Sequence, residues 1–299
     1  MKRIYIHSDD YAISVNASKD ILRAIDERKI DSISILPNMS CFEDCINMLK
    51  DKLKDNYIKI SVHINLIEGK CVSDKNLVYM LVDKNGYFKH SWINLFKYSY
   101  SFAKRELIKK QLKIEIKNQI EKIRRLTNKK IRIDSHQHTH MLPIVFEALM
   151  EVIDEENYEV EYIRVSQEPL VPYIKEISLY KTYSIMKIIS NIILNIYARK
   201  IKKILINKKI SFGSLWGVVM SGKMDIERIK KLEDDMIKVA LRKNDYLEIL
   251  FHIGSVLEEE ITSEYTKKDF IKFHLSENRK KEYDTVFLVN NIKKKGDNN

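Results

Sequence analysis

Residues 131–143 read IRIDSHQHTHMLP, and this stretch decides the fold. Its first five residues include two isoleucines, a β-branched residue type that strands favour. A polar run at 134–140 ends the strand, and Pro143 stands where it would open a helix, in the first-turn position that proline prefers. A strand, a polar turn and a helix in succession predict one unit of a parallel α/β fold.

The same unit recurs along the chain. Short β-branched runs alternate with helical patterns of ten or more residues, which implies parallel strands joined by right-handed crossovers. The sequence shows no interdomain linker, so we expect a single α/β domain over residues 1–299. The predicted strands are 2–8, 31–36, 58–65, 131–135, 160–166 and 246–251, and the clearest helices are 14–28, 42–53, 103–126, 143–156 and 225–242.

Composition excludes several classes of protein. With 299 residues, 44% hydrophobic and 32% charged, the chain is typical of a globular protein. The N-terminus does not resemble a signal peptide, and the apolar stretch 188–198 is too short to span a bilayer, so we expect a cytoplasmic protein without a transmembrane segment. Cys41, Cys45 and Cys71 match neither a disulfide scaffold nor a zinc ribbon, and we expect buried or unreactive thiols.

The net charge of +11 raises the question of nucleic-acid binding. The lysines are spread along the whole chain without a zinc-finger or RNP pattern, so we do not expect a nucleic-acid partner. Residues 170–210 are apolar, basic and helical in pattern. They fit either a basic amphipathic helix on a membrane surface or a packing helix that covers the barrel with its lysines exposed, and we favour the packing helix.

Polar residues recur at the ends of the predicted strands. In parallel α/β folds the C-terminal ends of the strands converge on one face and carry the active site. A recurrence at six strand ends therefore indicates a site for chemistry. The residues, in strand order, are Asp9-Asp10, Asn38, His63, the run 134–140, Arg164 and His252.

Three of these features suit a metal. Of the paired carboxylates Asp9 and Asp10, one could ligate a cation while the other accepts a proton from water, although such a pair alone is also typical of a solvated turn or a helix cap. His63 alone is more typical of a hydrogen-bonded core histidine. One Asp and two His would leave room for water and substrate, which suits zinc or another divalent cation.

The cluster His136, His138 and His140 is more specific, because it holds three of the eight histidines. On an extended segment all three would share one face, and one or two could reach a single metal. Asp134 could orient an imidazole. His7, His90 and His274 have no such neighbours in the sequence, and we expect surface or structural roles for them. The chain has no serine nucleophile elbow, Walker loop or dinucleotide fingerprint.

Four segments together resemble a known family. They are 8–11 (SDDY), 61–66 (SVHINL), 133–143 (IDSHQHTHMLP) and 251–254 (FHIG), with a weaker echo at Arg279 and Glu282. In this order they are similar to the YdjC-like carbohydrate deacetylases, a family that includes chitooligosaccharide (diacetylchitobiose) deacetylases. The resemblance implies a distorted (β/α) barrel with mainly parallel strands, a carbohydrate substrate and often a homodimer.

The resemblance also implies roles for single residues. Asp10, His63 and His136 would be the metal ligands, and the metal would be magnesium or zinc, of which two nitrogen ligands favour zinc. Asp9 would accept a proton, and His252 would stand beside the substrate as general acid or oxyanion stabiliser. The residues expected to bind substrate or to support the ligands are Arg164, Asp134, His138 and Tyr11.

The sequence departs from the family pattern at two places. Tyr11-Ala12 stands where Phe-Gly is usual, so we expect Tyr11 to alter the pocket wall, and Ile253 replaces a usual Pro. Neither change removes a ligand or the candidate base. The leading hypothesis is a metal-dependent hydrolase that deacetylates N-acetylated carbohydrates through metal-activated water. The alternatives are another metal-dependent hydrolase such as a phosphoesterase, or a non-catalytic sugar- or membrane-binding barrel.

Overall fold

The computed structural model describes residues 3–54, 57–126, 130–289, 291–293 and 295. Its centre is a seven-stranded sheet in the order β5-β4-β3-β2-β1-β7-β6, and each of these strand pairs is parallel. The first and last strands of the chain thus lie side by side. The strands are β1 (Arg3–Tyr11), β2 (Ser32–Ile35), β3 (Lys59–Ile64), β4 (Ile131–Ser135), β5 (Val160–Ile163), β6 (Ser214–Trp216) and β7 (Tyr246–Phe251).

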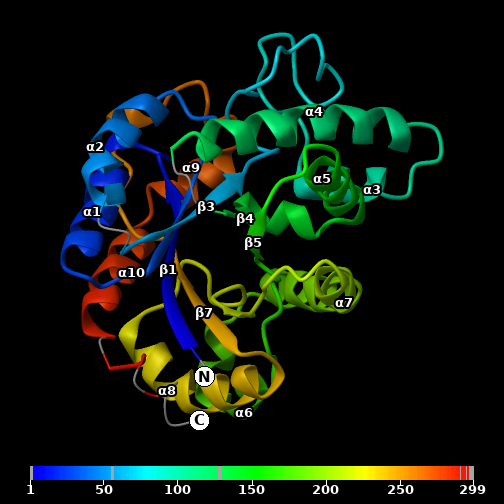
Figure 1. Ribbon diagram of the computed structural model, residues 1–299. Coiled ribbons are helices and arrows are strands. Elements are labelled where there is room, and N and C mark those ends of the chain that lie inside the picture. Colours follow the sequence, from blue (N-terminus) through cyan, green and yellow to red (C-terminus); the bar gives the residue numbers. More distant parts are fainter. Residues whose placement is uncertain (1–2, 55–56, 127–129, 290, 294, 296–299) are drawn as a thin grey trace.

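The sheet is curled (Figure 1), and a backbone bridge connects its two edges. Ser211, just before β6, forms a parallel bridge with Tyr162 of β5. The amide of Ile163 donates to the carbonyl of Ser211 at 3.0 Å, and the amide of Ser211 donates to the carbonyl of Glu161 at 3.1 Å. These bonds confirm the predicted α/β class and its distorted barrel of parallel strands.

Helices cover the outside of the barrel (Figure 1). Their starts follow from local sequence, because the side chains of Ser14 and Asp225 accept hydrogen bonds from the first turns of α1 and α8, and Pro143 opens α5. The α-helices are α1 (Val15–Asp26), α2 (Phe42–Lys54), α3 (Trp92–Tyr98), α4 (Arg105–Arg124), α5 (Pro143–Glu155), α6 (Val171–Lys175), α7 (Ile185–Asn207), α8 (Ile226–Lys243), α9 (Lys268–His274) and α10 (Glu277–Leu288), and the short 3₁₀ segments are η1 (His136–Met141), η2 (Ile177–Thr182) and η3 (Glu258–Glu260).

Some predicted boundaries were wrong. β1 continues to Tyr11, beyond the predicted end at residue 8, and Lys2 lies outside the described residues. The fifth strand ends at Ile163 instead of residue 166. Three elements were not predicted: β6, which has only three residues, α9 and α10. α10 was hard to predict because it buries polar residues, including Arg279 and Glu282, and therefore lacks an apolar stripe.

The segment 170–210 is helical, as predicted, and consists of α6, η2 and α7. Within the described part of the chain, no helix has both the length and the apolar character needed to cross a membrane. Cys41, Cys45 and Cys71 are free thiols, and Cys45 is buried in α2.

Candidate metal centre and active site

The site begins with an irregularity at the end of β1. Asp10 has a φ of +66°, and the pairing of β1 with β2 shifts register between Ser8 and Tyr11. Adjacent residues of a regular strand point to opposite faces, whereas a bulge can re-aim a side chain. As a result both carboxylates approach His63 Nε2, with Asp10 Oδ1 at 3.5 Å and Asp9 Oδ2 at 3.9 Å.

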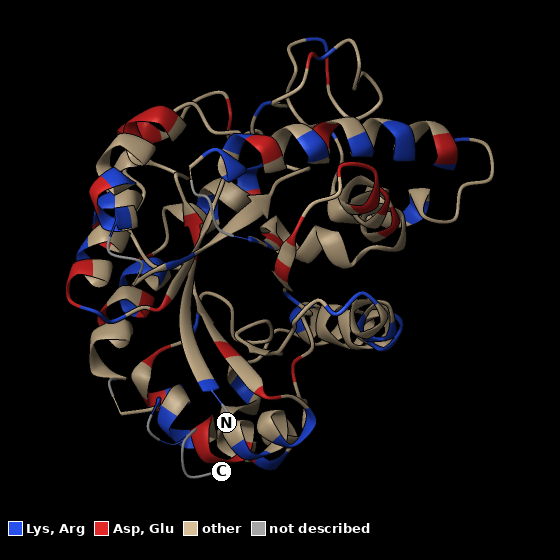
Figure 2. Ribbon diagram, in the orientation of Figure 1, with Lys and Arg blue, Asp and Glu red and all other residues tan. Residues whose placement is uncertain are grey.

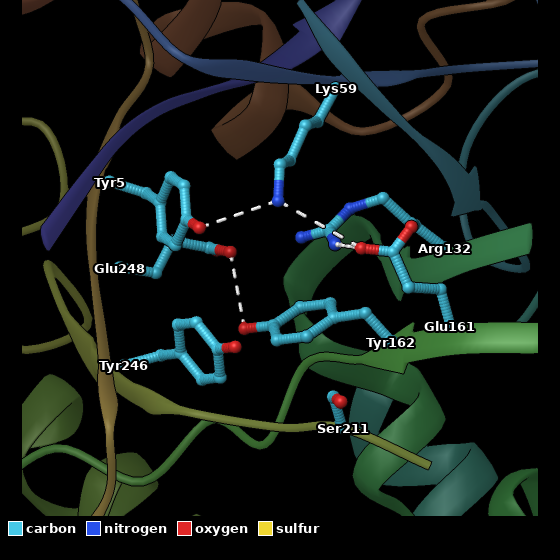
Figure 3. A pocket seen from close by; sticks show the side chains of 8 residues that line it. All are labelled: Tyr5, Lys59, Arg132, Glu161, Tyr162, Ser211, Tyr246 and Glu248. Atoms are coloured by element: carbon cyan, nitrogen blue, oxygen red, sulfur yellow. Dashed lines mark hydrogen bonds and ion pairs between the residues drawn. The ribbon is translucent and has the colours of Figure 1, made fainter. Parts of the chain in front are cut away.

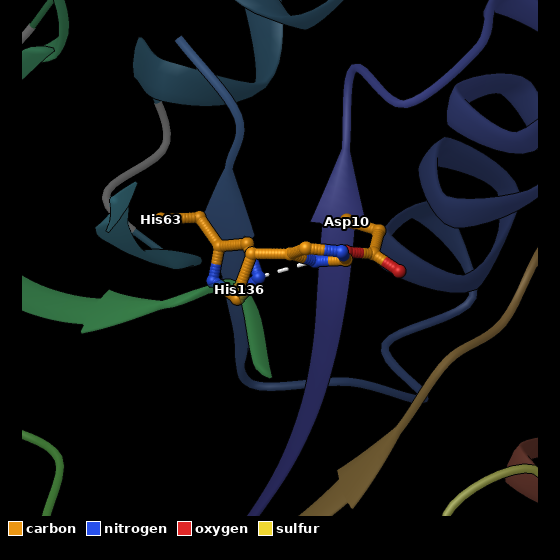
Figure 4. Close-up of side chains that lie close together, drawn as sticks. All are labelled: Asp10, His63 and His136. Carbon is orange, nitrogen blue, oxygen red and sulfur yellow. Dashed lines mark hydrogen bonds and ion pairs between the residues drawn. The ribbon is translucent and has the colours of Figure 1, made fainter. Parts of the chain in front are cut away.

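Asp10, His63 and His136 converge from the end of β1, from β3 and from the residue after β4, and β2 lies between β1 and β3 in the sheet (Figure 4). Asp10 Oδ1 lies 3.1 Å from His136 Nδ1 and 3.5 Å from His63 Nε2. One ligand atom from each residue lies within 4.8 Å of the others, and all three residues are buried. The structure therefore brings together the three residues that the sequence analysis assigned as ligands.

Each imidazole of this group has a carboxylate beside its other nitrogen. His63 Nδ1 lies 2.6 Å from Asp134 Oδ1, and His136 Nε2 lies 3.3 Å from Glu68 Oε2. Carboxylates in this position fix the orientation and tautomer of metal-binding histidines and raise their basicity. Asp134 was predicted for this role from its spacing, whereas Glu68, in the loop after β3, was missed.

The carboxylates make the cluster favourable for positive charge. Burial alone would lower the pKa of His63, but Asp9 and Asp134 outweigh it and raise the pKa to about 10. Asp10 and Glu68 likewise raise the pKa of His136 to about 9 against the effect of burial. Such an environment stabilises either protonated imidazoles or a cation held between them and Asp10.

The donor set fits a divalent metal ion. These residues would hold the ion through one carboxylate oxygen and two imidazole nitrogens, donor types that zinc accepts. Two nitrogens and one oxygen are typical of a catalytic zinc site rather than a closed structural one. Asp10, His63 and His136 are thus the residues that would hold the ion.

Asp9 lies beside these three residues and is bound by Arg164. The guanidinium donates to both carboxylate oxygens, with Nη1 to Oδ2 at 3.0 Å and Nη2 to Oδ1 at 2.8 Å. Arg164 also contacts Asp134 Oδ2 at 3.0 Å, and its Nε donates to Glu248 Oε1 at 2.6 Å. Burial alone would raise the pKa of Asp9, but Arg164 and His63 outweigh it and hold that pKa well below its usual range.

Two other members of the histidine run have structural partners. The segment after β4 is not extended as we expected, because Gln137 and His138 adopt left-handed conformations with φ of +50° and +56°. His138 consequently points to Ser166 Oγ, 2.9 Å from its Nδ1, and His140 lies between Ser135 Oγ at 2.6 Å and the carbonyl of Arg164 at 2.7 Å. Only His136 of the run reaches Asp10.

The C-terminal helices complete the site. Arg279 Nη1 donates to Asp10 Oδ2 at 3.0 Å. Glu282 accepts the backbone N–H of His252 at 2.6 Å and lies 3.7 Å from its Nδ1, while the ring of Phe273 packs edge-on against His252. The side chain of His252 remains 14% exposed, more than the ligand residues, which suits a group that meets substrate.

Three predictions for single residues need correction. Tyr11 does not line the site, because it is fully buried and its hydroxyl donates to the carbonyl of Cys45 in α2 at 2.7 Å. His7 and His274, which we set aside, contact site residues: His7 Nε2 lies 3.0 Å from Asp9 Oδ1, and His274 Nε2 lies 3.3 Å from Glu68 Oε2. His90 is structural, since its Nε2 lies 2.7 Å from the carbonyl of Met80.

The opposite, N-terminal mouth of the barrel holds a small polar pocket (Figure 3). Here Glu161 accepts from Arg132 at 2.8 Å, and Tyr162 donates to Glu248 Oε2 at 3.3 Å. Glu248 therefore links this pocket to Arg164 and through it to Asp9. A charged residue in the middle of the apolar β7 was the signal that could have revealed it.

The fold and the site together define a parallel α/β barrel protein with an Asp/His cluster at the C-terminal strand ends. The chain matches the family of YdjC-like proteins over residues 3–288, and it belongs to that family.

Curated relatives agree with this assignment. A carbohydrate deacetylase of Clostridium beijerinckii is 28% identical over 173 residues, which are 58% of this chain and 65% of the relative. A carbohydrate deacetylase of Thermoanaerobacter pseudethanolicus is also 28% identical, over 57% of this chain and 64% of the relative. The chain thus spans somewhat less than two thirds of their length.

A crystal structure from Enterococcus faecalis, described as a proposed cellobiose-phosphate cleavage protein, superposes with a TM-score of 0.61. It is 16% identical, and the match covers 95% of both chains. At this identity the likeness concerns the fold alone.

Proposed function

We propose that this protein is a metal-dependent hydrolase that removes the acetyl group from N-acetylated carbohydrates of the chitooligosaccharide type. The observation that carries the proposal is the difference between the adjacent carboxylates. Asp10 leaves Oδ1 toward His63 and His136 while Arg279 binds its other oxygen, whereas both oxygens of Asp9 accept hydrogen bonds from Arg164. One carboxylate is thereby available as a ligand and its neighbour as a proton acceptor. The deacetylase names of the relatives support the same reaction class.

Asp10, His63 and His136 would hold the cation, zinc or magnesium. When bound there, a divalent cation would supply positive charge for the carbonyl oxygen of the acetyl group and would lower the pKa of a water molecule. Asp134 and Glu68 keep the two imidazoles oriented toward Asp10. Arg164 keeps Asp9 ionised and fixed in position, so that it can accept a proton.

The chemistry then requires two proton transfers. Asp9 accepts a proton from the attacking water, whose oxygen bonds to the acyl carbon. The carbon–nitrogen bond breaks, and His252 gives a proton to the departing amine, which leaves acetate and the free amino sugar. His252 suits this role because Glu282 and Phe273 hold it while part of its ring stays exposed.

The deciding experiment measures acetate release from N-acetylglucosamine oligomers and phosphate release from phosphoesters. Protein is treated with a chelator and then supplied with Zn²⁺ or Mg²⁺. We expect acetate release that disappears on chelation and returns with the metal. Phosphate release alone would identify a phosphoesterase, and full activity of metal-free protein would exclude the proposed mechanism.

A further inference from the structure

The outward face of α7 is unusual for a surface helix. Its residues Ile185, Ile189, Ile192 and Ile196 recur at helical spacing, and all are exposed, with 75% exposure at Ile185 and 62% at Ile196. The inward face is well held, since Asn191 and Asn195 both donate to the carbonyl of Glu168. The apolar stripe is therefore a stable feature of the surface and is left without a partner in the monomer.

Aromatic residues extend this stripe. Tyr197 of α7 forms a hydrogen bond with Tyr100, hydroxyl to hydroxyl, at 2.6 Å. Tyr100 is itself 64% exposed, and Phe102, two residues further on, is fully exposed. Aromatic side chains of this kind are enriched where a protein meets the interface of a membrane.

The charge on the same helix has one sign. The outward stripe continues past Ile196 into Arg199, Lys200 and Lys203, which are exposed and make no ion pair with any described residue. The sequence contains no Asp or Glu from residue 177 to residue 224. In Figure 2 the ribbon of α7 is accordingly tan and blue.

We propose that the outward face of α7, with Tyr100 and Phe102, docks this protein on an anionic membrane surface. The isoleucines would enter the boundary between headgroups and acyl chains, and the three basic residues would meet lipid phosphates. The helix would lie on the bilayer without crossing it, which agrees with its interrupted apolar character. The docking is independent of the reaction proposed above.

Charge complementarity favours a lipid surface over a second copy of the chain. In an antiparallel two-fold pair of α7 helices, the basic half of each would face the apolar half of the other. In a parallel pair, Arg199, Lys200 and Lys203 would face their own copies. An anionic bilayer offers both an apolar layer and phosphates to one helix face.

The test is flotation of the full chain with vesicles of phosphatidylglycerol and phosphatidylcholine in equal parts, and with vesicles of phosphatidylcholine alone. We expect the protein to bind the anionic vesicles. Binding to neutral vesicles, and binding to anionic vesicles in high salt, should be much weaker. Changing Arg199, Lys200 and Lys203 to Gln should weaken binding on the order of 100-fold. The matched control changes Lys19, Lys110 and Lys238 to Gln, which removes the same charge from other exposed places.

A second variant tests the apolar stripe. Changing Ile185, Ile189 and Ile196 to Ser should abolish flotation while leaving the thermal melt intact, because these side chains are exposed. Leu77→Ser with Leu288→Ser is the control for loss of exposed apolar area. Absence of binding to anionic vesicles, or equal binding by both α7 variants and their controls, would overturn the proposal. A third outcome would also overturn it: a wild-type protein that binds no vesicles and is a dimer by light scattering, while the Ile→Ser variant is a monomer. That result would assign the face to a second copy of the chain.

Discussion

At the N-terminal mouth of the barrel Arg132 pairs with Glu161, whose side chain is 44% exposed. At the C-terminal strand ends Arg164 pairs with Asp9, Asp134 and Glu248, whose side chains are at most 5% exposed. Arg132 is itself buried, but water can solvate its half-exposed partner Glu161 and partly screens this pair. The buried carboxylates around Arg164 depend on the guanidinium for their counter-charge. The same residue types thus form a partly solvated pair at one end and a fully buried electrostatic arrangement at the other.

This difference explains why the site lies where it does. A reaction that develops charge benefits from charged groups that are already oriented and shielded from water. The C-terminal end supplies them, since each imidazole and carboxylate of the cluster has a fixed neighbour. The N-terminal pocket has polar walls, but none of the described residues that line it is a His or an Asp.

The largest effect is expected from the adjacent carboxylates. Asp9→Asn should leave metal binding intact yet reduce deacetylation by about 10²–10⁴-fold, the usual consequence of losing a general base. Asp10→Asn should lose metal and activity together. Metal content and acetate release of each purified variant are the measurements.

The two variants control each other, because general destabilisation would affect both alike. If both lose metal equally, or if Asp9→Asn keeps near-normal turnover, Asp9 is not the proton acceptor.

The second prediction compares the two arginines directly. Arg164→Leu leaves three carboxylates buried without their shared guanidinium and should lower the free energy of unfolding by about 3–5 kcal/mol. Arg132→Leu removes a buried guanidinium that packs over the ring of Tyr162, but it leaves only the half-exposed Glu161 unpaired, and it should cost about 1–2 kcal/mol. Urea denaturation of both variants decides the matter. Equal losses would mean that the two ends of the barrel do not differ in the way described.

Sequence reasoning found the parts of the site that stand at strand ends and missed those that depend on three-dimensional shape. Strand-end geometry predicted that Asp9-Asp10, His63 and the run 134–140 would meet, because parallel strands bring their C-terminal ends together, and the family resemblance singled out Asp10, His63 and His136 among them. The left-handed backbone conformations of Asp10 and His138 could not be predicted, since neither residue is a glycine. These conformations determine which side chains enter the cluster. Tyr11 was misplaced because it follows the irregular end of β1. Glu68 was not predicted because it lies in a loop, where no periodic pattern indicates the direction of a side chain.

The third prediction concerns Glu68, the carboxylate beside His136 Nε2. Glu68→Gln keeps the shape of the side chain but removes its charge, and should weaken zinc binding by about 10–100-fold. Glu161→Gln makes the same change at the other end of the barrel and should leave zinc affinity unaltered. Competition against a zinc chelator measures both. Unchanged affinity in Glu68→Gln would show that His136 needs no such partner.

The smallest effect is expected from Lys267, which lies at the C-terminal side of the barrel beside the loop that carries Glu68. Its Nζ donates to the carbonyls of Ile67 and His90, and burial lowers its pKa from 10.5 to about 8, although Glu68 partly opposes the shift. Between pH 8 and pH 10.5, Lys267 of the unfolded chain is still protonated, whereas Lys267 of the folded protein has released its proton. Raising the pH from 8 to 10.5 therefore favours folding through this group, and the gain is absent below pH 8.

Lys267→Met cannot titrate, so the melting temperature of the wild type should rise relative to that of the variant over this interval. Thermal melts of both proteins at pH 7, 8, 9 and 10 give the difference, and a constant difference would mean that Lys267 stays charged throughout.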